Sequence, residues 1–324
     1  MSAVRVGVAM AVYEPDEGYL RQQVDSMRAQ VGVTWTAHVV DDASSDRSFE
    51  HTRALLEGDD RFVLHRAPVN LGSVGAFGEA LRHVAGENVD AVALADQDDV
   101  WHPERLAATA AALGPDVAAV HSDLRLIDGE GAVIADSVWR RERRWATTDL
   151  RRTVFRNSVT GCALTVRPDV LDLALPLPDR PRPAPYHHDA WLTLHALRLG
   201  TVRALERPLV DYRAHGSNVV GVAQTGLVSV LRRRRRSLVS SLHDSVAGKR
   251  ALAQDFLDRV HEHPLRPDEY DDVAASVGLF VGSGTLADHR ALLAQTRGNA
   301  DLTRRLAQWY AGLAAGRLSR HPVP

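Results

Sequence analysis

The chain has 324 residues, of which 45% are hydrophobic and 25% are charged, and its formal net charge is -2. This composition is typical of a globular protein whose core is large enough to need no disulfide or structural metal. The single cysteine excludes a disulfide framework and a cysteine-built zinc site, and it favours a reducing compartment. The near-neutral charge provides no overall field that would attract nucleic acid, so no nucleic-acid partner is expected.

The sequence shows no targeting or membrane-spanning segment. The first residues run directly into a strand-like apolar pattern, without the long apolar core of a signal peptide. No stretch reaches the ~20 mostly apolar residues of a transmembrane helix. We therefore expect a cytoplasmic protein.

Strand and helix patterns alternate through the first part of the chain. Apolar runs predict strands at Val4–Val12, Thr34–Val40, Arg61–His65 and Ala91–Ala95. Helical spacing predicts helices at Glu17–Gln30, Ser48–Leu56, Val74–Val84 and Pro103–Leu113. Near-continuous apolar strands that alternate with helices are typical of a mainly parallel sheet covered on both faces, so we expect a Rossmann-like α/β fold.

The pattern changes after Val117. Further strands are predicted at Ala118–Ile127, Ala132–Val138, Cys162–Val166 and Thr201–Tyr212, with helices from Pro168 and at His188–Leu199. From Gly226 to Leu318 the sequence reads as helices, with a break at His263-Pro264. We therefore expect a first domain over residues 1–225 and a helical C-terminal extension over 226–324.

Acidic residues follow several of the first strands. Asp41 and Asp42 end the second strand, and Asp96-Gln97-Asp98 follows the fourth. Because ligands bind beyond the carboxyl ends of such strands, these residues should converge on one edge. Like charges brought together repel unless a cation lies among them, and a D-x-D pair suits Mg²⁺ or Mn²⁺ with a diphosphate. The alternative for Asp41 and Asp42 is to cap the helix that follows them.

Seven segments, in this order and spacing, resemble the family 2 glycosyltransferases with the GT-A fold, over roughly Val4 to Val220. The segments are Met10–Tyr13, Val40–Asp46, Asn70–Gly72, Leu94–Trp101, Asn157–Cys162, His188–Leu192 and Tyr212–Asn218. The D-Q-D-D-x-W form and the Tyr-Arg-x-His-Gly segment look most like the bacterial rhamnosyltransferase-like branch. The resemblance implies transfer of a sugar from a UDP- or dTDP-sugar to a glycan, a lipid-linked acceptor or a small molecule.

The resemblance also implies roles for single residues. The implied nucleotide-sugar contacts are Ala11, Tyr13, Glu14, Asp41 or Asp42 (with Asp42 favoured), Gly72 and Asp96. A divalent cation, Mn²⁺ or Mg²⁺, is implied at Asp98, with His215 as a last ligand, and Asp189 stands where the family has its catalytic base. The family's usual acidic residue before that base is His188 in this chain. His215 as a plain turn residue and Asp189 as a helix cap remain alternative interpretations.

The chemistry agrees with this set of residues. Sugar transfer requires positive charge on the leaving diphosphate and a carboxylate that takes the proton of the acceptor hydroxyl. Direct displacement by the acceptor would invert the anomeric centre. A sugar-phosphate nucleotidyltransferase is the alternative enzyme, but it would have a glycine-rich basic loop where Tyr13–Asp16 is acidic. A dehydrogenase is excluded because no G-x-G-x-x-G follows the first strand. A non-catalytic sugar-nucleotide-binding protein would be expected to lack Asp98 or Asp189.

One charge run has two interpretations. Five arginines follow one another at Arg232, Arg233, Arg234, Arg235 and Arg236. They could form a solvated helix face. They could also attract anionic lipid headgroups, at ~1 kcal/mol per basic residue near the surface, and so hold the protein peripherally on the inner membrane face.

Overall fold

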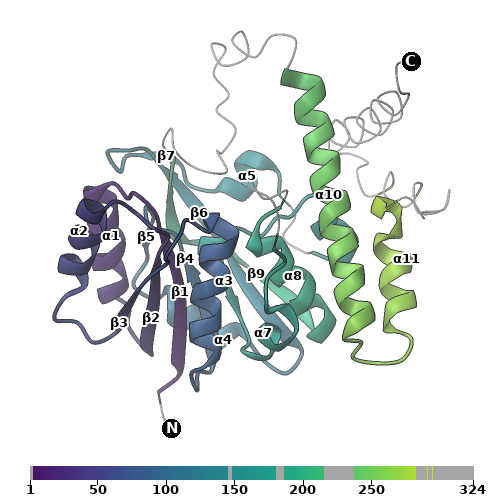
Figure 1. Cartoon of the computed structure of the whole chain (residues 1–324), viewed down its shortest axis with the longest axis horizontal. Helices are drawn as coiled ribbons and strands as arrows, with labels where there is room; N and C mark the ends of the chain where they lie inside the picture. The colour runs from purple at the N-terminus through teal and green to yellow at the C-terminus, as the bar shows by residue number, and fades with distance from the viewer. Residues whose placement is uncertain are drawn as a thin grey trace. The chain divides into compact units, whose positions relative to one another are not determined.

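A computed structural model gives the fold and describes residues 3–144, 148–179, 186–214, 237–281, 290 and 294. The chain divides into two compact units (Figure 1). The first lies within residues 1–149 and 157–215, and the second within 150–156 and 216–324. The positions predicted for His215 and for the arginine run at 232–236 lie outside the described residues.

The strands of the first unit form one mixed sheet. They are β1 (Arg5–Val12), β2 (Thr34–Asp41), β3 (Phe62–Arg66), β4 (Ala91–Ala95), β5 (Val100–Trp101), β6 (Val117–Ile127), β7 (Val133–Ala135), β8 (Leu164–Val166) and β9 (Thr201–Arg213). In the described residues their order is β3-β2-β1-β4-β8-β6-β9-β5, with β7 on β6. Strands β1 to β4 pair in parallel, whereas β8 is antiparallel to both of its neighbours. The predicted α/β class with a mostly parallel sheet is confirmed.

Helices cover the sheet. They are α1 (Glu17–Arg28), α2 (Asp46–Leu56), α3 (Gly72–Ala85), α4 (Arg105–Ala112), α5 (Val138–Glu142), α7 (Asp169–Ala174) and α8 (His188–Leu199), with a 3₁₀ turn η1 (Gly161–Ala163). Helix α3 packs on β1 and β2, and α8 packs on β6, β8 and β9 (Figure 1). Gly7 in β1 permits the close approach of α3, because a Cβ there would lie 2.4 Å from Cγ1 of Val84.

Two predicted boundaries are wrong for the same physical reason. The strand predicted at 132–138 covers only Val133–Ala135, because Ser137 accepts the N–H of Arg140 and starts α5 at Val138. Helix α2 begins at Asp46 rather than at Ser48, because the Oγ of Ser45 caps it. In both cases a serine hydroxyl satisfies a backbone donor of the first helical turn.

The described part of the second unit is helical, and the unit includes residues 150–156, which the sequence interpretation assigned to the first domain. It consists of α6 (Leu150–Phe155), α10 (Ser237–Glu262) and α11 (Glu269–Val281), and the predicted break at His263-Pro264 lies between the last two. Its buried side chains include Leu252, Phe256, Val260, Val277 and Phe280. Arg151 joins α6 to α11 by donating to the carbonyl oxygen of Ser276 at 3.1 Å. Among the helices of the described ranges, none combines the length and apolar character of a membrane span.

Candidate active site

The carboxyl ends of β1, β2 and β4 meet at one edge of the sheet. The register pairs Val12 with Asp41 and Met10 with Ala95, so the segments after these strands leave the sheet side by side. The side-chain amide of Gln97 joins two of them. Its Oε1 accepts the N–H of Tyr13 at 2.7 Å and its Nε2 donates to the carbonyl oxygen of Tyr13 at 3.2 Å. The predicted convergence of these loops is confirmed.

Glu14 connects the loop after β1 to the start of α2. Its backbone has φ of 39°. Its carboxylate accepts the backbone N–H of Ser45 at 2.6 Å and the hydroxyl of Ser48 at 2.6 Å. The hydroxyl of Ser48 is the main cause that lowers the pKa of Glu14. The carboxylate therefore holds the loop, while the adjacent Tyr13 side chain is 51% exposed and available to a ligand.

Asp42 supports the N-terminus of α3. Its Oδ1 accepts the N–H of Leu71 at 2.5 Å, and its Oδ2 accepts the N–H of Gly72 at 2.8 Å. A carboxylate at a helix N-terminus satisfies donors that have no partner within the helix and faces the positive end of its dipole. Gly72 has φ of 73°, which favours glycine. The interpretation that Asp42 caps the next helix is wrong, because Ser45 caps α2 and Asp42 serves α3.

Three carboxylates lie close together at this edge. Partial burial, followed by the charges of Asp98 and Asp189, raises the pKa of Asp96 to about 7. Burial also raises the pKa of Asp189, and it outweighs the bond at 2.6 Å from the N–H of Ala190. The helix N-terminus alone favours a fully ionised Asp189, so burial is the effect that sequence reasoning missed.

Two residues beside Asp189 had no role in the sequence interpretation. The side chain of Asn157 bonds to Asp189, and the charge of Arg144 also lowers the pKa of Asp189. Arg144 is fixed by Glu142 at 2.8 Å and by the hydroxyl of Thr160 at 2.6 Å. The sequence signal was present, because Arg144 ends the arginine-rich segment Arg140–Arg144 and Asn157 opens one of the seven family-like segments.

A buried layer lies beneath the acidic edge. Asp99 and Cys162 are fully buried, and burial raises the pKa of both groups well above their ordinary values. A protonated thiol is a poor ligand for a hard cation, so Cys162 serves as a packing residue under the site. Arg105 crosses below, donates to the carbonyl oxygen of Cys162 at 2.7 Å and lies 3.8 Å from the ring of Trp101. Trp101 is a packing residue, since it is only 2% exposed.

Arg213, the arginine of the Tyr-Arg-x-His-Gly segment, holds the acidic turn. Its backbone N–H donates to Oδ1 of Asp99 at 3.1 Å, and its Nε donates to the carbonyl oxygen of Asp98 at 2.9 Å. Its Nη1 also donates to the carbonyl oxygens of Asp128 and Gly129. The side chain of Arg213 thus fixes the backbone of the D-x-D turn at Asp98.

His188, the residue just before Asp189, is buried in apolar surroundings. Its ring stacks on Phe77 with the ring centroids 3.8 Å apart, and burial lowers its pKa to about 3. Neither ring nitrogen has a hydrogen-bond partner among the described residues. Such an imidazole stays neutral and is a weak base, which leaves Asp189 as the better-suited proton acceptor of the pair.

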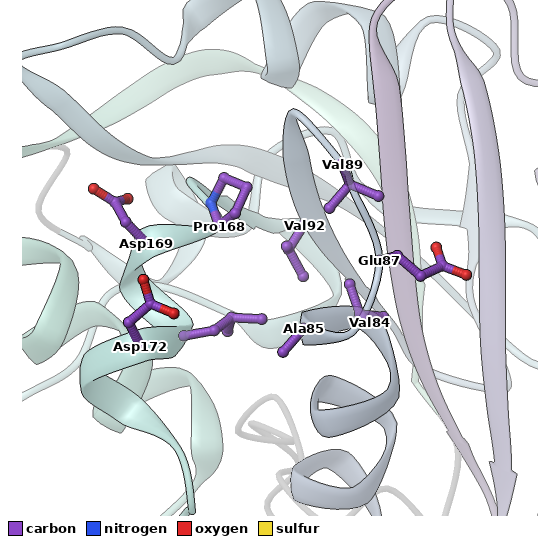
Figure 2. Close-up of a pocket in the computed structure, with 9 residues that line it drawn as sticks. Val84, Ala85, Glu87, Val89, Val92, Pro168, Asp169 and Asp172 are labelled. Carbon is purple, nitrogen blue, oxygen red and sulfur yellow. The ribbon is translucent and has the colours of Figure 1, made fainter.

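A separate small pocket lies at the opposite edge of the sheet (Figure 2). It has a volume of about 90 Å³ and lies between the end of α3, the start of β4 and the start of α7. Val84, Val92 and Leu171 line it, with the carboxylates of Asp169 and Asp172 at its rim. Because β4 begins there and ends at the acidic turn, this pocket is distinct from the candidate active site.

Comparisons with known proteins agree with this geometry. Residues 8–167 match the family model described as Glycosyl transferase family 2. An uncharacterized glycosyltransferase of Nostoc sp. is 27% identical over 206 residues, which are 62% of this chain and 62% of that protein. The alignment therefore spans less than two thirds of the relative.

Solved structures show the same fold. S. aureus TarS 1-349 in complex with UDP-GlcNAc has a TM-score of 0.56 at 14% identity, covering 99% of this chain and 93% of that one. The mannosyltransferase PcManGT from Pyrobaculum calidifontis, in complex with GDP-Man and Mn²⁺, has a TM-score of 0.54 at 17% identity, covering 99% and 89%. Residues 8–167, about half of the chain, thus form a domain that matches glycosyltransferase family 2, and the sheet order and the solved structures show the GT-A fold.

Proposed function

We propose that the protein transfers a sugar from a nucleotide-diphosphate sugar to an acceptor hydroxyl, with inversion at the anomeric carbon. The observation that carries this proposal is the meeting of Asp96, Asp98 and Asp189, from two distant segments, at the carboxyl edge of the sheet. UDP or dTDP is the nucleotide that the resemblance favours. The structurally similar TarS and PcManGT bind UDP-GlcNAc and GDP-Man, respectively, which supports a nucleotide-sugar donor.

Asp189 is the proposed general base. Burial raises the pKa of its carboxyl group, which makes the ionised form a stronger proton acceptor than an exposed aspartate. The charge of His187, the N–H of Ala190, the charge of Arg144 and the side chain of Asn157 favour the ionised form. Attack by the acceptor oxygen on the anomeric carbon then delivers the hydroxyl proton to Asp189, and the nucleoside diphosphate leaves.

The acidic turn suits a divalent cation. Burial and the charge of Asp98 raise the pKa of Asp96, so a cation between these two carboxylates would be favourable, and their oxygens are ligands that Mn²⁺ and Mg²⁺ prefer. We assign Asp98 as the main ligand, with Asp96 towards the ribose or sugar, and retain His215 as a proposed further ligand. When bound, the cation would stabilise the negative charge of the leaving diphosphate.

The base is tested with Asp189→Asn. Because the amide cannot accept a proton, sugar transfer should fall by ~10²–10⁴ while calorimetric affinity for the nucleotide sugar in Mn²⁺ changes little. The matched control is Asp172→Asn, which removes an exposed carboxylate at the opposite edge of the sheet (Figure 2). Near-normal transfer by Asp189→Asn would refute the assignment.

The cation is tested separately. Asp98→Asn should raise the Mn²⁺ concentration needed for half-maximal transfer, and excess chelator should abolish transfer by the unchanged protein. Full transfer in the presence of the chelator would contradict the metal assignment without bearing on Asp189.

A further inference from the structure

Three histidines gather away from the candidate active site. His38 lies in the middle of β2, His65 in β3 and His83 in the last turn of α3. The rings of His65 and His83 stack in parallel, with centroids 3.6 Å apart and planes 8° apart, and Nδ1 of His38 lies 3.0 Å from Nε2 of His65. One nitrogen from each ring can be chosen so that all three lie within 4.8 Å of one another. Three elements distant in sequence therefore bring three ligand-type nitrogens together.

Two carboxylates stand behind these rings. Oε1 of Glu87 is 2.8 Å from Nε2 of His38, and Oε1 of Glu79 is 3.5 Å from Nε2 of His83. In Figure 2 the carboxylate of Glu87 points away from the other residues that line the small pocket. A carboxylate at Nε2 holds the proton there and leaves the lone pair on Nδ1, as is usual for metal-binding histidines. In His38 this lone pair faces Nε2 of His65 at 3.0 Å, the contact that a metal ion would replace.

We propose that His38, His65 and His83 form a binding site for a transition-metal ion of the Zn²⁺ class. At a Zn–N distance of ~2.0–2.1 Å, two ligands of a tetrahedral ion lie about 3.3 Å apart, and the nitrogens of His38 and His65 are already separated by 3.0 Å. His83 must turn out of its stack to add a third nitrogen. Its side chain is 31% exposed, which leaves room for that rotation and for a water as fourth ligand.

The protonation of the cluster suits a metal. Burial and the neighbouring imidazoles lower the pKa of His65 and of His83, so both rings are neutral at neutral pH. Metal binding then displaces few protons, and the carboxylates of Glu79 and Glu87 supply negative charge around the cation. The neutral nitrogen donors distinguish this site from the acidic turn, because imidazole favours Zn²⁺ whereas carboxylate oxygens favour Mn²⁺ or Mg²⁺.

Such an ion would join the sheet to α3. Its ligands come from two adjacent strands and from the C-terminal end of the helix, whereas Asp42 holds the N-terminal end. The proposal does not depend on the proposed glycosyl transfer, because none of its ligands lies at the acidic edge.

The test measures metal binding on the whole chain freed of metal. Titration with Co²⁺ should give the intense visible absorption of a tetrahedral site, and Zn²⁺ should abolish it at one ion per chain. His65→Gln and His83→Gln are half-buried changes, and each should weaken Zn²⁺ binding, measured by competition with a chromogenic chelator, at least ~10-fold. His51→Gln on α2 is the matched control, and Asp98→Asn should bind Zn²⁺ as the unchanged protein does.

His38 is left unchanged, because it is buried and its replacement could unfold the protein. Folding of every other variant is checked by circular dichroism. Zn²⁺ should also raise the melting temperature of the unchanged protein and of His51→Gln, but not that of His65→Gln or His83→Gln. Zn²⁺ binding by folded His65→Gln and His83→Gln that equals the unchanged protein, or no Co²⁺ absorption at all, would overturn the site.

Discussion

Replacing Asp42 by alanine should destabilise the first unit by about 3 kcal/mol. The carboxylate accepts two backbone N–H groups at the start of α3, at 2.5 and 2.8 Å. Hydrogen bonds to a charged group contribute ~1.5–3 kcal/mol each, and the lower part of that range applies because Leu71 and Gly72 are half-buried and water can reach them. Asp42→Asn keeps one acceptor oxygen but turns an NH₂ group towards the other donor, so about half or more of the loss should remain.

Thermal unfolding followed by circular dichroism provides the measurement. For a unit of this size, ~3 kcal/mol corresponds to a fall in melting temperature of about 6–12 °C. The matched control is Asp46→Ala, at an exposed first position of α2, where the side chain is 90% exposed and its pair with Arg66 contributes at most ~1 kcal/mol. If Asp42→Ala melts with the unchanged protein but no longer binds nucleotide, the carboxylate contacts the ligand and the helix-support argument fails.

Three further outcomes are expected. His188 is protonated near pH 6.5 in the unfolded chain but only near pH 3 in the folded protein, so lowering the pH from 6.5 towards 3 destabilises the protein. Over this pH range the melting temperature of His188→Gln should fall less than that of the unchanged protein. An equal fall in both proteins contradicts the burial of a neutral ring. Arg213→Lys should lower the free energy of unfolding in urea by more than ~2 kcal/mol, because it leaves several half-buried carbonyl oxygens without their donor, whereas Arg203→Lys on the surface should not. Equal urea midpoints for the two variants would count against that role of Arg213. Gly161→Ala places a Cβ 2.8 Å from Nε2 of His188. The clash should shift the neighbouring Asp189 and slow sugar transfer, with the affinity for the donor retained. An unchanged rate in a kinetic assay shows that the turn accommodates the methyl group without moving Asp189.

The first four strands could be predicted because each is a local signal, an apolar run followed by polar residues. The order of the sheet beyond β4 could not. Strand β8 has three residues, Leu164–Val166, and its antiparallel insertion between β4 and β6 depends on contacts made by other parts of the chain. The start of α5 was missed for a different reason, since the β-branched residues after Ala132 outweighed the capping signal of Ser137.

The candidate site shows the same division. Sequence order was enough to place acidic residues at one edge, because the carboxyl ends of parallel strands share that edge. It could not show that Asp42 bonds to a backbone about thirty residues away, or that Arg144 and Asn157 act on Asp189. These contacts form only when the loops fold over the sheet, and so does the burial that raises the pKa of Asp189.

The amide of Gln97 has a consequence for exchanging the nucleotide specificity of this fold. The amide accepts the N–H of Tyr13 and donates to the carbonyl oxygen of the same residue, so two hydrogen bonds connect the loop after β1 to the middle of the D-x-D turn. A loop grafted after β1 from a relative with another donor would meet this pair of hydrogen bonds at its first residue, the position of Tyr13. Transplanting the two segments as a pair preserves both hydrogen bonds, whereas a chimera that exchanges only one of them loses the connection between the loop after β1 and the D-x-D turn.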